Sequence, residues 1–96
     1  MTFTHIVTFK WQEPKDYQPE IATALSTLAL SMDGVMSYLC GPDAGVTPGT
    51  YDFAVVGSFD SQESFLAYRD HPEHQRILND MILPNLETRT AVQISH

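Results

Sequence analysis

Alternating hydrophobic and polar positions predict that the N-terminal segment FTHIVTFKW (residues 3–11) is a β-strand. A period of two with aromatic and β-branched residues is typical of a strand with one buried face. The face expected to be buried consists of Phe3, His5, Val7, Phe9 and Trp11, and the other of Thr4, Ile6, Thr8 and Lys10. His5 is the polar member of an otherwise apolar face. We interpret it either as a hydrogen-bonded histidine at the edge of the core or as a side chain that lines a pocket.

A helix is expected next, because apolar residues then recur at spacings of four, three and four. The segment EPKDYQPE (13–20) predicts a turn leading into this helix, with Pro19 in its first turn. Gly34 is the expected end of the helix. The apolar stripe is formed by Ile21, Leu25, Leu28 and Met32.

The middle of the chain predicts two strands separated by a loop. The first runs from Val35 to Cys40, and the loop PDAGVTPG (42–49) follows it. The second strand, TYDFAVVGSF (50–59), has apolar residues on both faces, which favours a strand that is covered on both sides. Its faces are Tyr51, Phe53, Val55 and Phe59 on one side and Ala54 and Val56 on the other.

The last third of the chain predicts an interrupted helix and a final strand. Asp60 and Glu63 have the spacing of a capping box at the helix start. Pro72 interrupts the helix, and a second helical segment continues to Pro84. The closing strand ETRTAVQI (87–94) places Thr88, Thr90, Val92 and Ile94 on one face.

The predicted order of elements is therefore βαββαβ in a single domain that spans residues 1–96. This order matches the α+β, ferredoxin-like plan of one antiparallel sheet with helices on one face. The sheet face without helices would carry Ile6, Ala54, Val56 and either Tyr38 or Leu39. Because an apolar sheet face exposed to water is costly, we expect a second copy of the chain to cover it in a homodimer.

The charge of the chain argues against two classes of partner. Twelve acidic and five basic residues give a net charge of −7. The basic residues are scattered, whereas binding to nucleic acid or to an anionic membrane requires clustered positive charge. Neutral or cationic small molecules are weakly favoured at such a surface. With one cysteine, Cys40, and no apolar run of about 20 residues, the chain is expected to be a soluble cytoplasmic protein without an internal disulfide.

The segment AYRDHPEHQR (67–76) carries the densest set of chemically active side chains. Pro72 disfavours a helical conformation at the preceding residue and suits the first turn of a new helix, so Asp70 or His71 is expected at a helix junction. In one continuous helix Tyr68 and His74 would lie about 240° apart, on different faces. Across a break the two side chains could converge.

Three roles compete for the side chains of this segment. His71 and His74 have a spacing that can share a metal, but nothing nearby completes a set of about four ligands, so no metal site is expected. Alternatively, His74 acts as a general base, kept neutral by the helix dipole, while Tyr68 donates a hydrogen bond to a developing oxyanion. In the third interpretation both side chains are solvated surface. No nucleophile motif and no phosphate-binding or dinucleotide-binding loop accompanies them, so no cofactor is expected.

The chain resembles the stress-responsive A/B barrel (Dabb) domain family. The resemblance rests on the segments HIVTFKW, YDFAVVGSFDSQESFLAY, HPEHQ and RTAVQI, in this order, and extends roughly from Phe3 to Ile94. It implies a ferredoxin-like fold that dimerises through its sheets into an α/β barrel. Many members of this family have no known activity. A few, among them a plant polyketide cyclase, close rings without a cofactor.

The resemblance also implies a site. The second histidine of HPxH serves as the base in that cyclase, assisted by the tyrosine six residues before it, and these positions correspond to His74 and Tyr68. His5 corresponds to a pocket histidine. Shared strand faces place Val7, Phe9, Phe53 and Val55 in the walls of the same cavity. Two functions are therefore carried forward: a small-molecule-binding or structural homodimer, and a cofactor-independent enzyme of the cyclase or isomerase type acting on a small carbonyl or phenolic compound.

Overall fold

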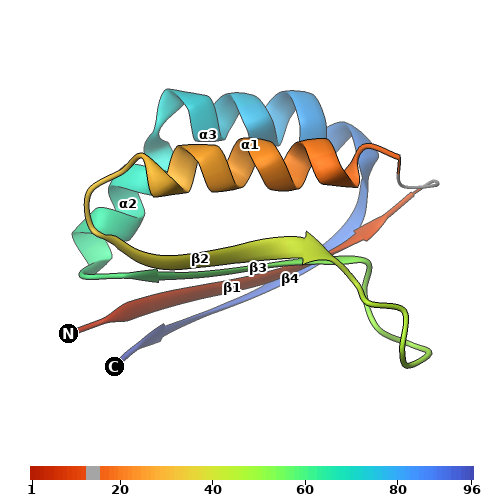
Figure 1. Cartoon of the computed structure of the whole chain (residues 1–96), viewed down its shortest axis with the longest axis horizontal. Helices are drawn as coiled ribbons and strands as arrows, with labels where there is room; N and C mark the ends of the chain where they lie inside the picture. The colour runs from red at the N-terminus through yellow and green to blue at the C-terminus, as the bar shows by residue number, and fades with distance from the viewer. Residues whose placement is uncertain (13–15) are drawn as a thin grey trace.

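The computed structural model describes residues 1–12 and 16–96 and contains a β-sheet with helices packed on one face (Figure 1). In chain order the described elements are β1 (Phe3–Trp11), α1 (Gln18–Leu30), β2 (Val35–Pro42), β3 (Phe53–Phe59), α2 (Gln62–Asp70), α3 (Pro72–Ile77), a π-helical turn η1 (Leu78–Ile82), a 3₁₀ turn η2 (Leu83–Asn85) and β4 (Leu86–Ser95). None of the described helices is long and apolar enough to cross a membrane. The predicted order of strands and helices is confirmed.

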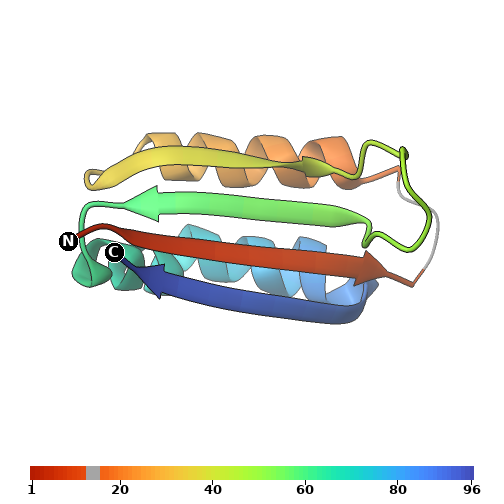
Figure 2. The ribbon, with the colours of Figure 1, turned by 90° about the horizontal axis from the view of Figure 1, so that it is seen from below.

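The described strands form one antiparallel sheet in the order β2-β3-β1-β4 (Figure 2). The two central strands, β1 and β3, are the first strands of the two halves of the βαββαβ sequence, as the ferredoxin-like plan requires. β4 lies at the edge beside β1, with Gln93 opposite His5 and Arg89 opposite Phe9. The C-terminal strand therefore lies next to the N-terminal strand that carries His5.

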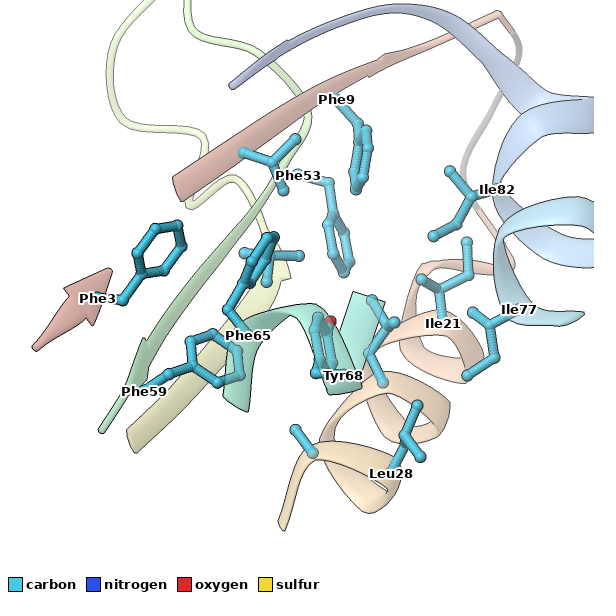
Figure 3. Packing of buried hydrophobic residues seen from close by; sticks show 14 of the residues in the cluster. Phe3, Phe9, Ile21, Leu28, Phe53, Phe59, Phe65, Tyr68, Ile77 and Ile82 are labelled. Atoms are coloured by element: carbon cyan, nitrogen blue, oxygen red, sulfur yellow. The ribbon is translucent and has the colours of Figure 1, made fainter. Parts of the chain in front are cut away.

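The core lies between the sheet and the helices, and aromatic side chains dominate it (Figure 3). Phe59 has no exposed surface, and its ring centroid lies 5.4 Å from that of Phe65 and 5.3 Å from that of Tyr68. The stripe expected on α1 is confirmed for Ile21, Leu25 and Leu28, which are buried. Other members of the core are Phe3, Val7, Phe9, Trp11, Phe53, Val55, Ile77 and Ile82.

Several predicted boundaries are wrong by a few residues. α1 ends at Leu30, before Met32, although Met32 still packs against the core from the turn that follows. β3 begins at Phe53, so Tyr51 does not belong to its face. Its neighbour Asp52 ends the ladder, because the Asp52 N–H donates to the Phe9 carbonyl and the Asp52 carboxylate accepts from the Trp11 N–H. The predicted turn at 13–20 falls partly on residues 13–15, outside the described residues.

The start of α2 also differs from the prediction. Ser61, not Asp60, is the N-cap, and its Oγ accepts a hydrogen bond from the Ser64 N–H at 3.1 Å. Asp60 instead accepts hydrogen bonds from both serine hydroxyls. The turn before β2 passes close to this cap at Gly34, whose φ is +87° and where a Cβ would overlap the Ser64 side chain. Glycine is required here by both conformation and space.

The predicted helix junction at Pro72 is confirmed. His71 is extended and separates α2 from α3, and Pro72 occupies the first turn of α3. The Nδ1 atom of His71 accepts a hydrogen bond from the Glu73 N–H at 3.0 Å, so this histidine is the N-cap of α3. Beyond Ile77 the helical path widens into the π turn η1, which the sequence pattern did not indicate. The junction changes the direction of the chain between Tyr68 and His74.

The sheet face opposite the helices exposes an apolar row that crosses all four described strands. Strand register aligns Leu39, Val56, Ile6 and Val92 from one edge to the other, with Ile94 beside them. Leu39 is 73% exposed, whereas Tyr38 points to the helix side and bonds to Tyr68. Leu39, not Tyr38, is therefore the β2 residue of the open face.

Candidate functional site

A pocket of about 400 Å³ lies between the helical layer and the half of the sheet formed by β1 and β4. This volume is in the range of sites for small organic ligands. Most of its wall is apolar, and its polar groups come from four elements, β1, α2, α3 and β4. The lining residues are His5, Val7, Phe9, Leu25, Val55, Phe65, Tyr68, Arg69, His74, Gln75, Leu78, Ile82, Leu83, Leu86, Arg89 and Gln93.

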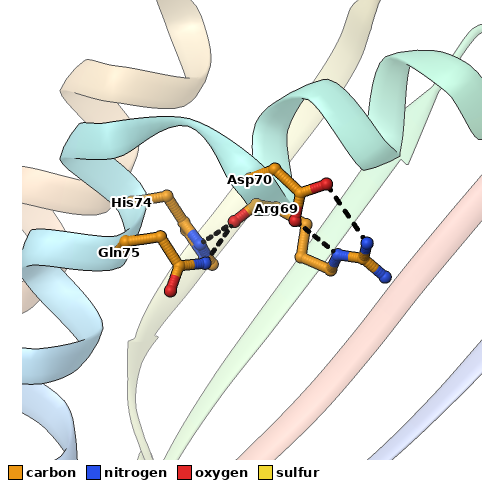
Figure 4. A network of polar contacts seen from close by, with 4 residues as sticks. All are labelled: Arg69, Asp70, His74 and Gln75. Carbon is orange, nitrogen blue, oxygen red and sulfur yellow. Dashed lines mark hydrogen bonds and ion pairs between the residues drawn. The ribbon is translucent and has the colours of Figure 1, made fainter.

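His74 is held in one tautomer by the chain on the other side of the junction. Its Nδ1 donates a hydrogen bond to the carbonyl oxygen of Arg69 at 3.0 Å (Figure 4). A carbonyl oxygen can only accept, so the proton of neutral His74 resides on Nδ1 and Nε2 keeps its lone pair. Nε2 has no hydrogen-bond partner among the described residues and is not sealed in the core. His74 thus presents an acceptor nitrogen to the pocket.

The protonation state of His74 suits the same role. Burial lowers its pKa below the ordinary value of 6.5, although the Arg69 carbonyl and the Asp70 carboxylate act in the opposite direction. The dominant cause is thus burial of the residue, which is 9% exposed. A neutral imidazole near pH 7 is competent to accept a proton.

Tyr68 lies directly against His74, with ring centroids 4.4 Å apart. The side chain is 2% exposed, and its hydroxyl shares a 2.5 Å hydrogen bond with the hydroxyl of Tyr38. Burial raises the pKa of Tyr68 to about 12, so the phenol keeps its proton at neutral pH. When Tyr38 is the donor in this pair, the Tyr68 hydrogen is available to a ligand oxygen.

His5 differs from His74 in which ring nitrogen carries the proton. The side-chain amide nitrogen of Gln93 donates to His5 Nδ1 at 3.2 Å, so the proton of neutral His5 resides on Nε2. Burial lowers the pKa of His5 to about 4, and the nearby charges of Arg89 and His74 act in the same direction. Its ring lies 4.9 Å from that of Phe65. His5 is therefore a neutral donor in the same pocket in which His74 is a neutral acceptor.

The lowered pKa of His5 predicts how the free energy of unfolding depends on pH. Between about pH 6.5 and about pH 4, His5 is protonated in the unfolded chain and neutral in the folded chain. The unfolded state therefore binds more protons in this window, and the free energy of unfolding decreases as pH falls from about 6.5 to about 4. We expect His5→Gln to flatten this part of the curve, as measured by urea unfolding at several pH values.

The reference for that experiment is the wild type, unfolded by urea at the same pH values between about 6.5 and about 4. Equal slopes in the wild type and in His5→Gln would contradict the assignment of His5 as a group kept neutral by burial.

The positive charges at the pocket are not equivalent. Arg69 binds Asp70 through two hydrogen bonds, at 2.9 and 3.1 Å, and its backbone carbonyl accepts from His74 and Gln75 (Figure 4). Its charge is thus balanced locally. Arg89 takes part in none of the ion pairs among the described residues. Among residues 1–12 and 16–96, no aspartate or glutamate lines the pocket.

The structure brings together most of the side chains singled out from the sequence. His5, Val7, Phe9, Val55, Tyr68 and His74 all line this one pocket. Phe53 does not line it: this side chain is 1% exposed and packs in the core against Phe9 and Trp11. His71 uses its Nδ1 to accept a hydrogen bond from the backbone of α3 and does not line the pocket. No cluster of three or more potential metal ligands occurs among residues 1–12 and 16–96.

Two polar residues of β4 that line the pocket, Arg89 and Gln93, were not predicted from the sequence. The strand pattern assigned Thr88, Thr90, Val92 and Ile94 to one face, and register confirms that this face carries Ile6 as well. The alternate positions Arg89 and Gln93 therefore point to the helix side, where they line the pocket. Polar residues on the inward face of a strand are the signal that could have identified them.

The fold and the pocket define a ferredoxin-like α+β domain with a ligand-sized cavity between its sheet and its helices. The chain belongs to the stress responsive A/B barrel domain (Dabb) family, whose model matches residues 3–95. No functionally curated protein matches the sequence.

Three solved structures illustrate the range of similar proteins. A dimeric ferredoxin-like protein of unknown function from Thermobifida fusca is 40% identical, with a TM-score of 0.87 over 100% of this chain and 92% of that one. A hydroxynitrile lyase from Passiflora edulis is 17% identical, with a TM-score of 0.77 over 97% and 91% of the two chains. SnoaB, a cofactor-independent oxygenase from Streptomyces nogalater, is 6% identical, with a TM-score of 0.80 over 99% and 92%. The last two likenesses show the fold alone.

Proposed function

We propose that the pocket binds a small carbonyl or phenolic compound and that His74 moves a proton on it without a cofactor. The observation that carries this proposal is the hydrogen bond from His74 Nδ1 to the Arg69 carbonyl, which leaves the lone pair of Nε2 for a ligand. Lowering of the His74 pKa by burial supports the same role, because the ring is then neutral at physiological pH.

The chemistry follows from the two tautomers. Nε2 of His74 takes a proton from an acidic C–H next to a carbonyl group, and the electron pair of that bond moves to the carbonyl oxygen as an enolate. The Nε2–H of His5 or the hydroxyl of Tyr68 donates a hydrogen bond to this oxygen. Return of the proton from His74 to carbon or to a leaving group completes the step. Isomerisation, elimination and aldol-type ring closure all begin in this way.

The same fold carries enzymes in other proteins. Among them are a hydroxynitrile lyase and a cofactor-independent oxygenase. Removal or transfer of a proton is compatible with an apolar pocket that carries few polar groups, such as the one lined by His5, Tyr68 and His74.

A panel of small ketones, keto acids and phenols tests the proposal. Binding is measured by the shift in melting temperature, because a ligand of the folded state raises it by mass action. Proton transfer is measured by NMR as exchange of carbon-bound hydrogen for deuterium in D₂O. We expect at least one compound to bind and exchange faster with the protein than with buffer. Binding of panel compounds without enhanced exchange of any of them would reduce the function to ligand binding.

We further propose that the chain acts as a homodimer joined through the open sheet face into an α/β barrel. The similar protein from Thermobifida fusca is described as dimeric. The apolar row formed by Leu39, Val56, Ile6 and Val92 supports this face as the interface, because it crosses the whole described sheet. In the single chain Ile6 is partly buried and the other three side chains are exposed.

Replacing Val56 with glutamate should separate the dimer. Val56 lies on β3 in the middle of the row, and a carboxylate buried against a second sheet without a partner is strongly unfavourable. The matched control is Val46→Glu, which places the same charge on a loop residue that is 84% exposed. Sedimentation velocity should show a dimer for the wild type and Val46→Glu and a monomer for Val56→Glu. A dimer that survives Val56→Glu would place the interface elsewhere.

A further inference from the structure

The charge of the pocket is opposite to that of the protein as a whole. The chain carries a net charge of −7, yet the described residues that line the pocket include two arginines and no carboxylate. Arg69 is neutralised by Asp70, and burial keeps His5 and His74 neutral near pH 7. The positive charge that remains without a balancing anion among the described lining residues is that of Arg89.

The position of Arg89 relative to the polar groups is set by the sheet. Arg89 lies opposite Phe9 on the adjacent strand, and Gln93, four residues further along β4, lies opposite His5. Side chains four residues apart in a strand point to the same face, so Arg89 and Gln93 both face the helix side. Arg89 also acts electrostatically on His5, whose pKa it lowers. The guanidinium therefore stands along the same wall as His5, on the side towards Phe9 and Leu86.

We infer that Arg89 selects ligands that carry a carboxylate, binding this group while the rest of the molecule extends over the apolar wall towards His5 and His74. This inference rests on the function proposed above and adds the substrate class to it: a keto acid or an aromatic acid with an acidic C–H or phenol group. A guanidinium presents parallel N–H donors that match the two oxygens of a carboxylate.

The charge of the pocket favours a carboxylate over other anions. One unbalanced positive charge matches a monoanion, whereas a phosphate of charge about −2 would be only partly neutralised. The local guanidinium therefore decides the preference.

The test uses one pair of probes, 3-benzoylpropanoate and its primary amide, 3-benzoylpropanamide. Both have an aromatic ring for the apolar wall and a ketone with exchangeable hydrogens, and they differ in charge. Dissociation constants are measured by isothermal titration calorimetry at pH 7. We expect the wild type to bind the acid about tenfold more tightly than the amide, as for a hydrogen-bonded charge pair at a partly exposed site.

The variants separate this inference from the function on which it rests. Arg89→Gln should remove the preference for the acid while affinity for the amide stays as in the wild type. Arg89→Lys keeps the charge but not the paired donors, and should retain part of the preference. The matched control Arg76→Gln removes an arginine on α3 that binds Glu73 and does not line the pocket, and should keep the full preference.

Each outcome has one meaning. Equal binding of acid and amide by the wild type, or a preference that survives Arg89→Gln, overturns the role of Arg89 and leaves the proposed function standing. Failure of the wild type to bind either probe, with no exchange of their hydrogens, overturns both. Circular dichroism and the melting temperature of each variant identify any loss of folding, and Arg89→Lys then provides the decisive comparison.

Discussion

Replacing His74 with glutamine is expected to lower the rate of proton exchange on a bound ligand by about 10²- to 10⁴-fold, the usual contribution of a general base. The glutamine amide can still donate to the Arg69 carbonyl, which His74 Nδ1 binds at 3.0 Å, so the fold and the pocket should be preserved. What is lost is the basic lone pair of Nε2. NMR in D₂O measures the exchange rate, and calorimetry should show that ligand affinity changes only a few-fold.

The other histidine of the same motif provides the matched control. His71 caps α3 through its Nδ1 atom and does not line the pocket. His71→Ala should cost about 1 kcal/mol of stability, as for a lost N-cap, while the exchange rate at saturating ligand stays unchanged. His74→Gln is thus expected to lower the exchange rate, and His71→Ala is expected to lower the stability.

The opposite pattern would contradict the assignment of His74. If His74→Gln lowers the melting temperature and leaves the exchange rate intact, the histidine is a structural part of the helix junction. The pH dependence gives a second check, because the rate should fall only below a pKa that lies under 6.5, where His74 becomes protonated.

Replacing Phe59 with alanine is expected to cost about 3–5 kcal/mol, the largest effect on stability of any change considered for this chain. Phe59 has no exposed surface and contacts Phe65 and Tyr68. Removal of its ring leaves a cavity beneath the tyrosine that packs on His74. Domains of this size have a total stability of about 5–15 kcal/mol, so a large part of it would be lost. Urea unfolding followed by circular dichroism measures the change.

Leu30→Ala is the control for the loss of apolar volume. Leu30 lies at the end of α1 and is 72% exposed, so its replacement should change stability by no more than about 0.5 kcal/mol. A cost below about 1 kcal/mol for Phe59→Ala would show that the core can collapse around the missing ring, and that Tyr68 does not depend on it for its position.

Periodicity in the sequence was sufficient to predict the order of the elements and the inward faces of β1 and α1. These faces are local properties, because side chains alternate in a strand and recur every three to four residues in a helix. Boundaries failed for two different reasons. The end of β3 depends on a distant residue, because the Asp52 carboxylate accepts from the Trp11 N–H. The cap of α2 is local, and it depends on which of two adjacent polar side chains, Asp60 or Ser61, accepts from the Ser64 N–H.

The sequence by itself determined that Pro72 breaks the helix and that His71 lies at the break, because the proline ring restricts the residue before it. The candidate pair Tyr68 and His74 came from the same motif. Whether they meet was decided by the tertiary structure: the junction turns the chain so that His74 folds back on the Arg69 carbonyl and its ring reaches Tyr68. The tertiary structure likewise decided that Arg89 and Gln93 line the pocket. Pairing of β4 with β1 places these residues beside His5, and strand pairing between the two ends of a chain leaves no local pattern in its sequence.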